Sequence, residues 1–200
     1  MMGRFRMNTK LATGAIATAM FLLTACGAGS DEEVTSVSIQ KDGTVLSHIV
    51  EEFEQSYYDQ EELQQAILKE AAEYNKAAGN GRINVEKINV DGGVATVRMV
   101  YQNAGDYAGF NHVVFFAGTA SDAQEEHELN VVLSGVKDTN DTLSKADILA
   151  MEGYKILITD IKEPVYLDGR AEYISDNVTA ANDRKSVWIS GAGQGYVLYK

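Results

Sequence analysis

The sequence predicts an α+β fold in which a hairpin, helix and second hairpin precede a strand-rich C-terminal half within one domain. Two observations predict it. Asp-Gly pairs separate short apolar runs, and such pairs supply the positive φ angles of tight hairpin turns. Between the first two hairpins, apolar residues recur at steps of three and four, which is typical of one amphipathic helix. The sole proline, Pro164, leaves no proline-rich linker, so we expect residues 34–200 to form a single domain.

The opening unit is the most regular part of the sequence. Runs 34–40 and 44–53 flank Lys41-Asp42-Gly43 and are predicted to form the first hairpin. The tetrapeptide 59–62, Asp-Gln-Glu-Glu, is typical of a capping box, in which the Asp59 side chain accepts from a backbone amide and Glu62 reaches back. The helix that follows ends at 79–81, Gly-Asn-Gly. Its apolar face is expected to comprise Leu63, Ala66, Ile67, Ala71, Tyr74 and Ala78.

The later elements are predicted in chain order. Runs 83–90 and 94–101 flank Asp91-Gly92-Gly93 and indicate a second hairpin, whereas the glycine-rich segment 103–111 resembles a loop. Segment 113–116 indicates a short buried strand or helix turn, and segment 121–128 a short polar helix.

The C-terminal part returns to strand-like runs. Segment 154–161 alternates apolar and polar residues and is predicted to be a strand. Segments 165–167 and 171–174 flank Asp168-Gly169. Segments 186–189 and 196–199 flank a glycine loop, which we interpret as the loop of a hairpin.

The N-terminus has the organisation of a secretory signal. Arg4, Arg6 and Lys10 form a basic head, and an apolar run of about 13 residues extends from Leu11 to Leu23. A helix needs roughly 18 to 20 apolar residues to span the hydrocarbon core of a bilayer, so this run is too short to be an anchor helix. Residues 1–25 are therefore predicted to be a removable signal peptide.

The run ends in Leu23-Thr24-Ala25-Cys26, which resembles the lipobox of bacterial lipoproteins. The resemblance implies that the signal peptidase recognises Leu23, Thr24 and Ala25 and cleaves before Cys26. It also implies that the Cys26 sulfur carries a diacylglyceryl group, which would be the lipid attachment site on the extracytoplasmic face of the membrane. The domain beyond Cys26 loosely resembles uncharacterised lipoproteins of Gram-positive anaerobes, and this second likeness implies no catalytic residues.

Composition agrees with such a tethered protein. Cys26 is the single cysteine, so no intramolecular disulfide can form. Residues 26–33 have the small and charged side chains of a flexible tether with a reach of roughly 15 Å. Without residues 1–25 the chain has 14 Lys and Arg against 29 Asp and Glu, a net charge of −15. This excess makes a nucleic-acid partner improbable, because phosphate binding needs a basic surface, and leaves the acyl chains as the expected membrane contact.

We find no catalytic or cofactor motif and expect no metal or cofactor. The glycine loop 191–195 is followed by a strand-like run, whereas a dinucleotide-binding loop precedes a helix. The acidic turn 137–142 begins like a calcium loop but has Leu143 and Leu149 where an EF-hand needs glycine and glutamate. We interpret it as a solvated turn before a short helix capped by Ser144. The histidines, His48, His112 and His127, lack the spacing of zinc ligands.

The remaining feature is a group of aromatic residues with polar neighbours, which we expect to be core, with a shallow sugar or peptide pocket as the alternative. Its members are Tyr57, Tyr58, Tyr101, Tyr107, Phe110, Phe115 and Phe116, interleaved with Asn103, Asp106 and Asn111. The sequence thus favours a non-catalytic binding or interaction module whose ligand is an unknown protein, peptide or glycan. The alternative is a secreted envelope hydrolase with a dispersed active site.

Overall fold

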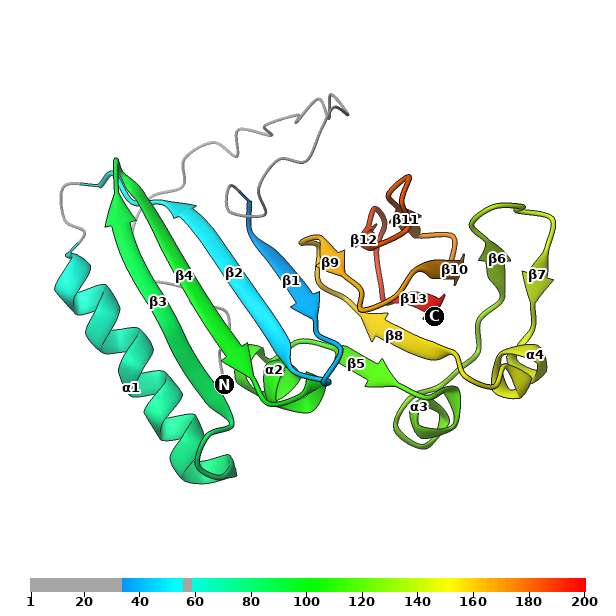
Figure 1. Cartoon of the computed structure of the whole chain (residues 1–200), viewed down its shortest axis with the longest axis horizontal. Coiled ribbons are helices and arrows are strands. Elements are labelled where there is room, and N and C mark those ends of the chain that lie inside the picture. The colour runs from blue at the N-terminus through cyan, green and yellow to red at the C-terminus, as the bar shows by residue number, and fades with distance from the viewer. Residues whose placement is uncertain (1–33, 56–58) are drawn as a thin grey trace.

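The computed structural model describes residues 34–55 and 59–200, and it has an α+β fold as the sequence predicts (Figure 1). Its strands form two sheets. Sheet A has seven strands in the order β11-β12-β9-β1-β2-β4-β3, and sheet B has six strands in the order β5-β8-β13-β10-β6-β7. Four helices of this part of the chain lie beside the sheets.

The first predicted hairpin is confirmed as β1 (Ser36–Ile39) and β2 (Val45–Glu52), which pair in antiparallel fashion. Gly43 has a φ of 87° in the connecting turn, a backbone conformation that glycine adopts readily. The carboxylate of Asp42 accepts hydrogen bonds from the hydroxyl and the backbone amide of Thr44, and these bonds lower the Asp42 pKa. Asp42 and Gly43, the residues on which the prediction rests, therefore form the turn of this hairpin.

Helix α1 (Gln60–Ala78) begins and ends where the sequence indicates. Asp59 caps it by accepting from the backbone amides of Glu61 and Glu62, which is one half of the expected capping box. Leu63, Ile67 and Ala71 are the buried residues of its apolar face. The helix thereby covers one face of sheet A beside β3, as the left side of Figure 1 shows.

The second predicted hairpin is also confirmed. β3 (Ile83–Asp91) and β4 (Val94–Tyr101) pair in antiparallel fashion, and β4 also pairs with β2 along its whole length. Buried and exposed residues alternate along β4, with Ala95, Val97, Met99 and Tyr101 all on the core side. One face of this part of sheet A thus contributes to the core.

The interpretation of segment 103–111 as a loop is wrong, because most of it forms helix α2 (Ala104–Asn111). Asn103 caps this helix by accepting from the amide of Asp106 at 2.9 Å. Glycine lowers helix propensity, which is why the composition suggested a loop. The tertiary contacts of Tyr107 and Asp106, both buried, outweigh that cost.

Short elements connect α2 to the C-terminal strands. β5 (Phe115–Gly118) shows that segment 113–116 leads into a strand and not a helix turn, although Phe115 alone of its residues is buried. α3 (Ala120–Glu126) agrees with the predicted short polar helix. β6 (Leu133–Gly135) and β7 (Thr142–Leu143) flank the acidic turn. Helix α4 (Lys145–Ala150) follows, and Ser144 caps it as expected through a reciprocal capping box with Asp147.

The C-terminal strands are β8 (Lys155–Thr159), β9 (Val165–Tyr166), β10 (Ala171–Ile174), β11 (Val178–Ala180), β12 (Ser186–Ile189) and β13 (Gly195–Tyr199). The predicted hairpin around the glycine loop is wrong, because β12 belongs to sheet A and β13 to sheet B. The strands that flank Asp168-Gly169 are separated in the same way, since β9 belongs to sheet A and β10 to sheet B. Both loops carry the chain from one sheet to the other.

Side-chain hydrogen bonds fix the loop between β12 and β13. The Asn177 amide donates to the backbone oxygens of Ala192 and Gln194 at 3.1 and 3.0 Å, and the Asn177 backbone oxygen accepts from Ser190. Gly195, where β13 begins, faces Val178 so closely that a β-carbon there would lie 2.6 Å from its Cγ2 atom. The loop is therefore fastened to the start of β11, which its glycine-rich sequence does not indicate.

Two hydrophobic clusters fill the fold. The first lies between sheets A and B and includes α1 and α2 residues, and the second lies on the other face of sheet B beneath α3 and α4. Leu157 of β8 belongs to the first cluster, and its neighbours Ile156 and Ile158 belong to the second. The strand predicted for segment 154–161 is confirmed as β8, but its central residues are all apolar and both of its faces are buried, so β8 separates the two cores.

Candidate functional site

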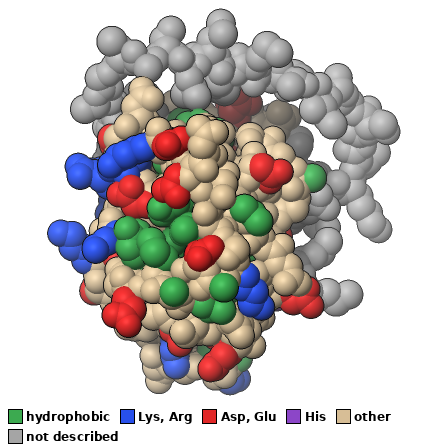
Figure 2. Space-filling view, turned by 90° about the vertical axis from the view of Figure 1, so that its right-hand side faces the viewer, with side chains coloured by type: hydrophobic (Ala, Val, Ile, Leu, Met, Phe, Trp, Pro, Cys, Tyr) green, Lys and Arg blue, Asp and Glu red, His purple; other side chains and the backbone are tan. Residues whose placement is uncertain are grey.

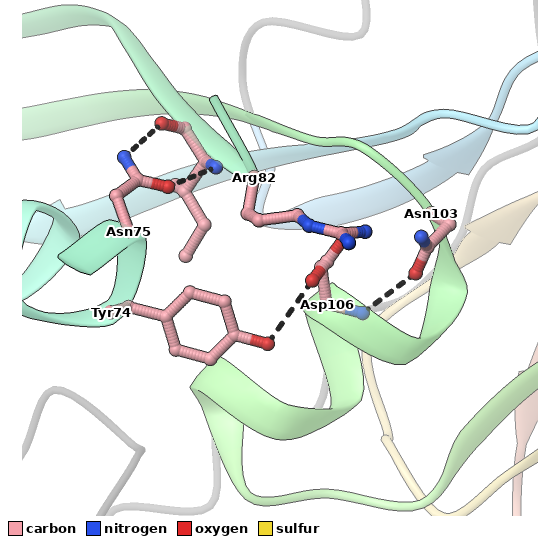
Figure 3. Close-up of polar contacts among 6 residues, drawn as sticks. Tyr74, Asn75, Arg82, Asn103 and Asp106 are labelled. Atoms are coloured by element: carbon pink, nitrogen blue, oxygen red, sulfur yellow. Dashed lines mark hydrogen bonds and ion pairs between the residues drawn. The ribbon is translucent and has the colours of Figure 1, made fainter. Parts of the chain in front are cut away.

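A buried carboxylate at the junction of α1, β3 and α2 is the first candidate site (Figure 3). Asp106 lies in the first turn of α2 and is 6% exposed. One of its oxygens accepts from the Tyr74 hydroxyl at 3.3 Å, and the other lies 3.5 Å from the Arg82 guanidinium. Asp106 of α2 thus contacts both Tyr74 of α1 and Arg82, the residue just before β3.

Local sequence positions each of these groups. Asn103, three residues before Asp106, caps α2 and so sets the orientation of its first turn. Gly109 follows one turn later, and a β-carbon there would lie 2.9 Å from the Tyr74 hydroxyl. A glycine therefore allows the Tyr74 ring to approach α2. Burial, followed by the charge of Asp106, raises the Tyr74 pKa.

The aromatic group predicted to be core surrounds this junction. Tyr101 and Tyr107 have ring centroids 5.0 Å apart, and Tyr107 and Phe115 have centroids 4.7 Å apart. All three are buried, so the core interpretation is confirmed for them. Phe110 is partly buried against Tyr74, with centroids 5.7 Å apart.

The other members of the aromatic group are placed elsewhere. Phe116 belongs to the second cluster and contacts His127, with ring centroids 5.3 Å apart. Tyr57 and Tyr58 lie outside the described residues. Asn111 donates to the backbone oxygen of Tyr107 at 2.9 Å and so belongs to the α2 scaffold. The sequence therefore grouped residues that the fold divides between two cores.

The chemistry of the junction is that of an anchor. Both carboxylate oxygens of Asp106 already have a partner, and the neighbouring Tyr101 hydroxyl is buried, which raises the Tyr101 pKa to about 12. A phenol with so high a pKa stays protonated near neutral pH and so cannot act as a base there. The arrangement can fix three segments relative to one another, and it presents neither a nucleophile nor a base to solvent.

A second buried carboxylate lies where the chain crosses between the sheets after β9. Asp168 has a side chain that is 9% exposed, and one of its oxygens accepts from the Lys155 ammonium at 2.5 Å. The other oxygen and the Tyr199 hydroxyl are both buried without a hydrogen-bond partner. Burial, followed by the Asp168 charge, raises the Tyr199 pKa. The two groups are therefore close, although their geometry falls outside that of a hydrogen bond.

A small cavity lies between the two sheets at their C-terminal strands. Its volume is about 10 Å³, close to what a single water molecule needs. The lining residues are Thr159, Ile161, Glu163, Val165, Val178, Val187, Trp188, Ile189, Gly195 and Val197.

The carboxylates of the acidic turn between β6 and β7 accept hydrogen bonds from other groups of the protein. Asp138 accepts from the backbone and side-chain amides of Asn140, and Asp141 accepts from the Tyr173 hydroxyl at 2.8 Å. Both aspartates are exposed, in agreement with a solvated turn. Among residues 34–55 and 59–200, no three His, Cys, Asp or Glu side chains form a group that could hold a metal ion.

The end of the molecule formed by β6, β7 and α4 faces the viewer in Figure 2. Hydrophobic side chains there form small groups that are separated by acidic, basic and other polar atoms. Val132, just before β6, is 62% exposed and is the most exposed of the large hydrophobic residues described. A single exposed hydrophobic residue of this kind is ordinary in a folded protein.

Sequence reasoning missed the partners of both buried carboxylates. Arg82, Lys155 and Tyr199 gave no signal, because each lies far along the chain from the aspartate that it contacts. The sequence indicates Asp106 only as a polar neighbour of aromatic residues. The spacing of Asn103 and Asp106 is that of a helix N-cap and its third residue, and this signal could have revealed α2.

The predicted lipid-attachment residue, Cys26, and the recognition residues Leu23, Thr24 and Ala25 lie outside the described residues. Within the described part of the chain, no helix has the length and hydrophobicity to cross a membrane. Comparisons with protein families, with curated proteins and with solved structures give no match for this chain.

Proposed function

We propose that this chain is a lipid-anchored lipoprotein on the extracytoplasmic face of a bacterial membrane, where it acts as a non-catalytic binding or interaction module. The lipid anchor is proposed from the sequence Leu23-Thr24-Ala25-Cys26, which follows a basic head and an apolar run. These four residues stand at the end of a run that has the length of a signal peptide. The proposed partner in the membrane is the lipid on Cys26.

Charge supports attachment through acyl chains. The chain beyond residue 25 has a net charge of −15, so an anionic bilayer surface would repel the domain. Acyl chains contribute roughly 0.8 kcal/mol for each buried methylene, and stable attachment generally takes two chains. A diacylglyceryl group supplies both chains at one residue.

Among the described residues, the carboxylates with shifted pKa values have local structural roles, which favours a non-catalytic module. Hydrogen bonds from Thr44 lower the pKa of Asp42, and hydrogen bonds from Ser144 lower the pKa of Asp147. Both aspartates are exposed and stabilise local turns or caps. A hydrolase site would instead be expected to place shifted carboxylates together in a cleft.

The test is intact-mass analysis of the membrane fraction from a bacterial host that expresses the full chain or its Cys26→Ala variant. The wild-type protein is expected to begin at Cys26 and to carry the mass of an added diacylglyceryl group. The variant is expected to lack that mass, while its domain stays folded. A wild-type protein with a free Cys26 thiol, or with cleavage elsewhere, would contradict the proposal.

The non-catalytic part has its own test. The purified full chain is incubated with chromogenic ester, peptide and glycoside substrates at several concentrations of protein. We expect no turnover above that of a preparation purified in parallel from cells without the gene. Turnover that rises in proportion to protein concentration would favour the envelope hydrolase instead.

A further inference from the structure

The turn between α1 and β3 contains the single Asn-Gly pair of the sequence. The turn comprises Gly79, Asn80 and Gly81, and it lies at the lower end of α1 in Figure 1. The side-chain carbonyl carbon of an asparagine can be attacked by the backbone nitrogen of the next residue. Glycine in that next position favours the attack, because it has no β-carbon to hinder the approach.

The structure leaves both reacting groups of this pair accessible. Asn80 and Gly81 are exposed, and within the described chain neither the Asn80 side chain nor the Gly81 N–H has a hydrogen-bond partner. A β-carbon built on Gly81 would meet no atom within 4 Å apart from its chain neighbours. Glycines on both sides of Asn80 also allow the backbone to rotate at little cost. The fold therefore does not hold the Asn80 side chain away from the Gly81 nitrogen.

The other asparagines of residues 34–55 and 59–200 lack this combination. One group uses its side-chain amide in hydrogen bonds and comprises Asn75, Asn103, Asn111, Asn140 and Asn177. The other group precedes valine or aspartate and comprises Asn84, Asn89, Asn130 and Asn182. A β-carbon beside the attacking nitrogen hinders its approach, most of all when that carbon is branched. Asn80 is thus the described asparagine with the fewest obstacles to this reaction.

Aspartates that precede glycine can undergo a related reaction in which water leaves, and the structure restrains two of them. Hydrogen bonds from Thr44 hold the Asp42 carboxylate and lower its pKa, and an ionised carboxylate is a poor target for a nucleophile. The Asp168 side chain is 9% exposed and pairs with Lys155. An amide has no such charge and loses ammonia instead. We therefore expect Asn80 to react before these aspartates.

We propose that Asn80 is a site of spontaneous deamidation, with the Gly81 backbone nitrogen as nucleophile and water as co-reactant. The Gly81 nitrogen loses its proton and bonds to the Asn80 side-chain carbonyl carbon, and the side-chain nitrogen leaves as ammonia. Water then opens the five-membered imide at either carbonyl. Opening at the side-chain carbonyl gives aspartate, and opening at the backbone carbonyl gives isoaspartate, which lengthens the main chain by one methylene. The inference does not depend on the proposed function.

The isoaspartate product alters the junction of α1, β3 and α2. Arg82 lies two residues after Asn80, and its guanidinium lies 3.5 Å from the Asp106 carboxylate (Figure 3). The next residue, Ile83, exchanges two hydrogen bonds of 2.8 Å with the Asn75 side chain. A methylene added to so short a turn displaces these contacts. The isoaspartate form is consequently less stable than Asn80→Asp, which adds the same charge without the extra length.

The test follows deamidation of the purified full chain during warm storage at mildly alkaline pH. Peptide mapping by mass spectrometry measures the fraction of each asparagine that has gained about 1 Da, the difference between an amide and a carboxyl group. Asn80 is expected to react more than about tenfold faster than every other described asparagine. Its rate should also lie within about tenfold of its rate in the same chain unfolded in guanidinium chloride, because the fold does not restrain it.

Failure of either rate comparison would overturn the proposal. Asn80→Gln is the matched control, because it keeps the amide but would have to close a larger ring. The acidic form that ion exchange separates from the stored wild-type protein should therefore be absent from stored Asn80→Gln. An acidic form of equal abundance in that variant would place the reaction elsewhere in the chain and refute the assignment to Asn80.

The effect on the junction has a separate measurement. The deamidated fraction from ion exchange contains both products, so Asn80→Asp is its reference. The Tm of this fraction is expected to lie about 3 °C below that of Asn80→Asp, roughly the shift that loss of one hydrogen bond causes in a chain of this size. Equal Tm values would show that the turn absorbs the added methylene and would overturn the predicted loss of stability.

Discussion

The N-terminal unit (residues 34–101) and the C-terminal strands (residues 155–199) are both mostly β, yet they are connected in different ways. In the N-terminal unit, β1 pairs with β2 and β3 with β4, so each strand pairs with its neighbour in sequence. In the C-terminal strands, β9 pairs with β1 and β12, and β13 pairs with β8 and β10. Similar Asp-Gly and glycine-rich loops thus produce hairpins in one region and sheet crossings in the other.

The difference shows what a turn signal specifies. Asp42-Gly43 and Asp168-Gly169 both mark places where a strand ends. After the first, the chain returns along the same strand, whereas after the second it enters the other sheet. Local residues determine that the chain turns, and distant contacts determine which strand it then meets.

The largest expected effect comes from truncating a core residue in each region. Leu157→Ala is expected to lower the free energy of unfolding by about 4 kcal/mol, because Leu157 is fully buried on a strand with both faces covered. Leu63→Ala is expected to cost about 3 kcal/mol, because Leu63 on α1 is buried but still 8% exposed. Urea denaturation of the full chain provides both values.

The same experiment tests whether the regions unfold together. The fluorescence of Trp188, the single tryptophan, reports on the C-terminal strands, and far-UV circular dichroism reports on α1. Because both regions contribute to the first hydrophobic cluster, the two signals should change in one transition. Separate transitions in the wild type or in Leu63→Ala would show that the regions are independent domains.

The second effect is a loss of stability in alkali. Burial raises the Tyr101 pKa to about 12, so between pH 10 and about 12 this tyrosine ionises only when the protein is unfolded. Its contribution is complete below the unfolded pKa and should fall by about 2 kcal/mol across that range. Denaturation at about pH 9 and about pH 11 should show a loss of about 1.3 kcal/mol.

Phenylalanine variants separate the two regions in this experiment. Tyr101→Phe should remove the part of the alkaline loss of stability that comes from the N-terminal unit. The part that comes from the C-terminal strands should remain, because burial also raises the pKa of Tyr199. An unchanged alkaline slope in Tyr101→Phe would contradict the assignment.

The third comparison concerns the two buried carboxylates. Asp168 lies 2.5 Å from the Lys155 ammonium, whereas Asp106 lies 3.5 Å from Arg82. Asp168→Asn is therefore expected to cost about 2 kcal/mol and Asp106→Asn about 1 kcal/mol. Double-mutant cycles with Lys155→Met and Arg82→Met measure the pairwise coupling. A larger coupling for Asp106 than for Asp168 would reverse the ranking.

The fourth comparison removes one hydroxyl from each region. Tyr74→Phe loses the bond to Asp106 and should cost about 1 kcal/mol. Tyr199→Phe should change stability by less than about 0.5 kcal/mol, since its hydroxyl has no hydrogen-bond partner. Thermal denaturation of both variants suffices. A marked loss of stability in Tyr199→Phe would reveal a stabilising interaction with Asp168 despite the lack of hydrogen-bond geometry.

The smallest expected effect is that of calcium on the acidic turn between the two regions. Asp138 and Asp141 already accept hydrogen bonds from Asn140 and Tyr173. The Tm with millimolar calcium and with chelator should therefore agree within a few degrees. A large rise with calcium would indicate a native-state site, because a ligand that binds the folded state stabilises it.

Much of the N-terminal unit could be predicted because its determinants are local. Asp59, the spacing of Leu63, Ile67 and Ala71, and the two Gly-containing turns act within a few residues of the elements that they define. Helix α2 was missed because its stability comes from burial of Asp106 and Tyr107, whose partners lie on other elements.

The candidate sites could be predicted even less. The Asp106 anchor needs Tyr74 and Arg82, which are 32 and 24 residues away, and Asp168 needs Lys155, 13 residues away across a sheet crossing. Contacts of this kind follow from topology, and no periodicity in one sequence specifies topology. The aromatic spacing predicted burial correctly for Tyr101, Tyr107 and Phe115, because burial depends mainly on residue type.

The place of β13 in sheet B has a consequence for the order of events in folding. β13 is the last strand in the sequence, yet it lies inside sheet B between β8 and β10. The interior of the sheet therefore cannot close until residues 195–199 have left the ribosome, and long-range pairing of this kind slows folding. At roughly 5 to 20 residues per second, synthesis leaves the earlier strands waiting for many seconds. We expect a nascent chain without these residues to stay protease-sensitive until β13 has been synthesised.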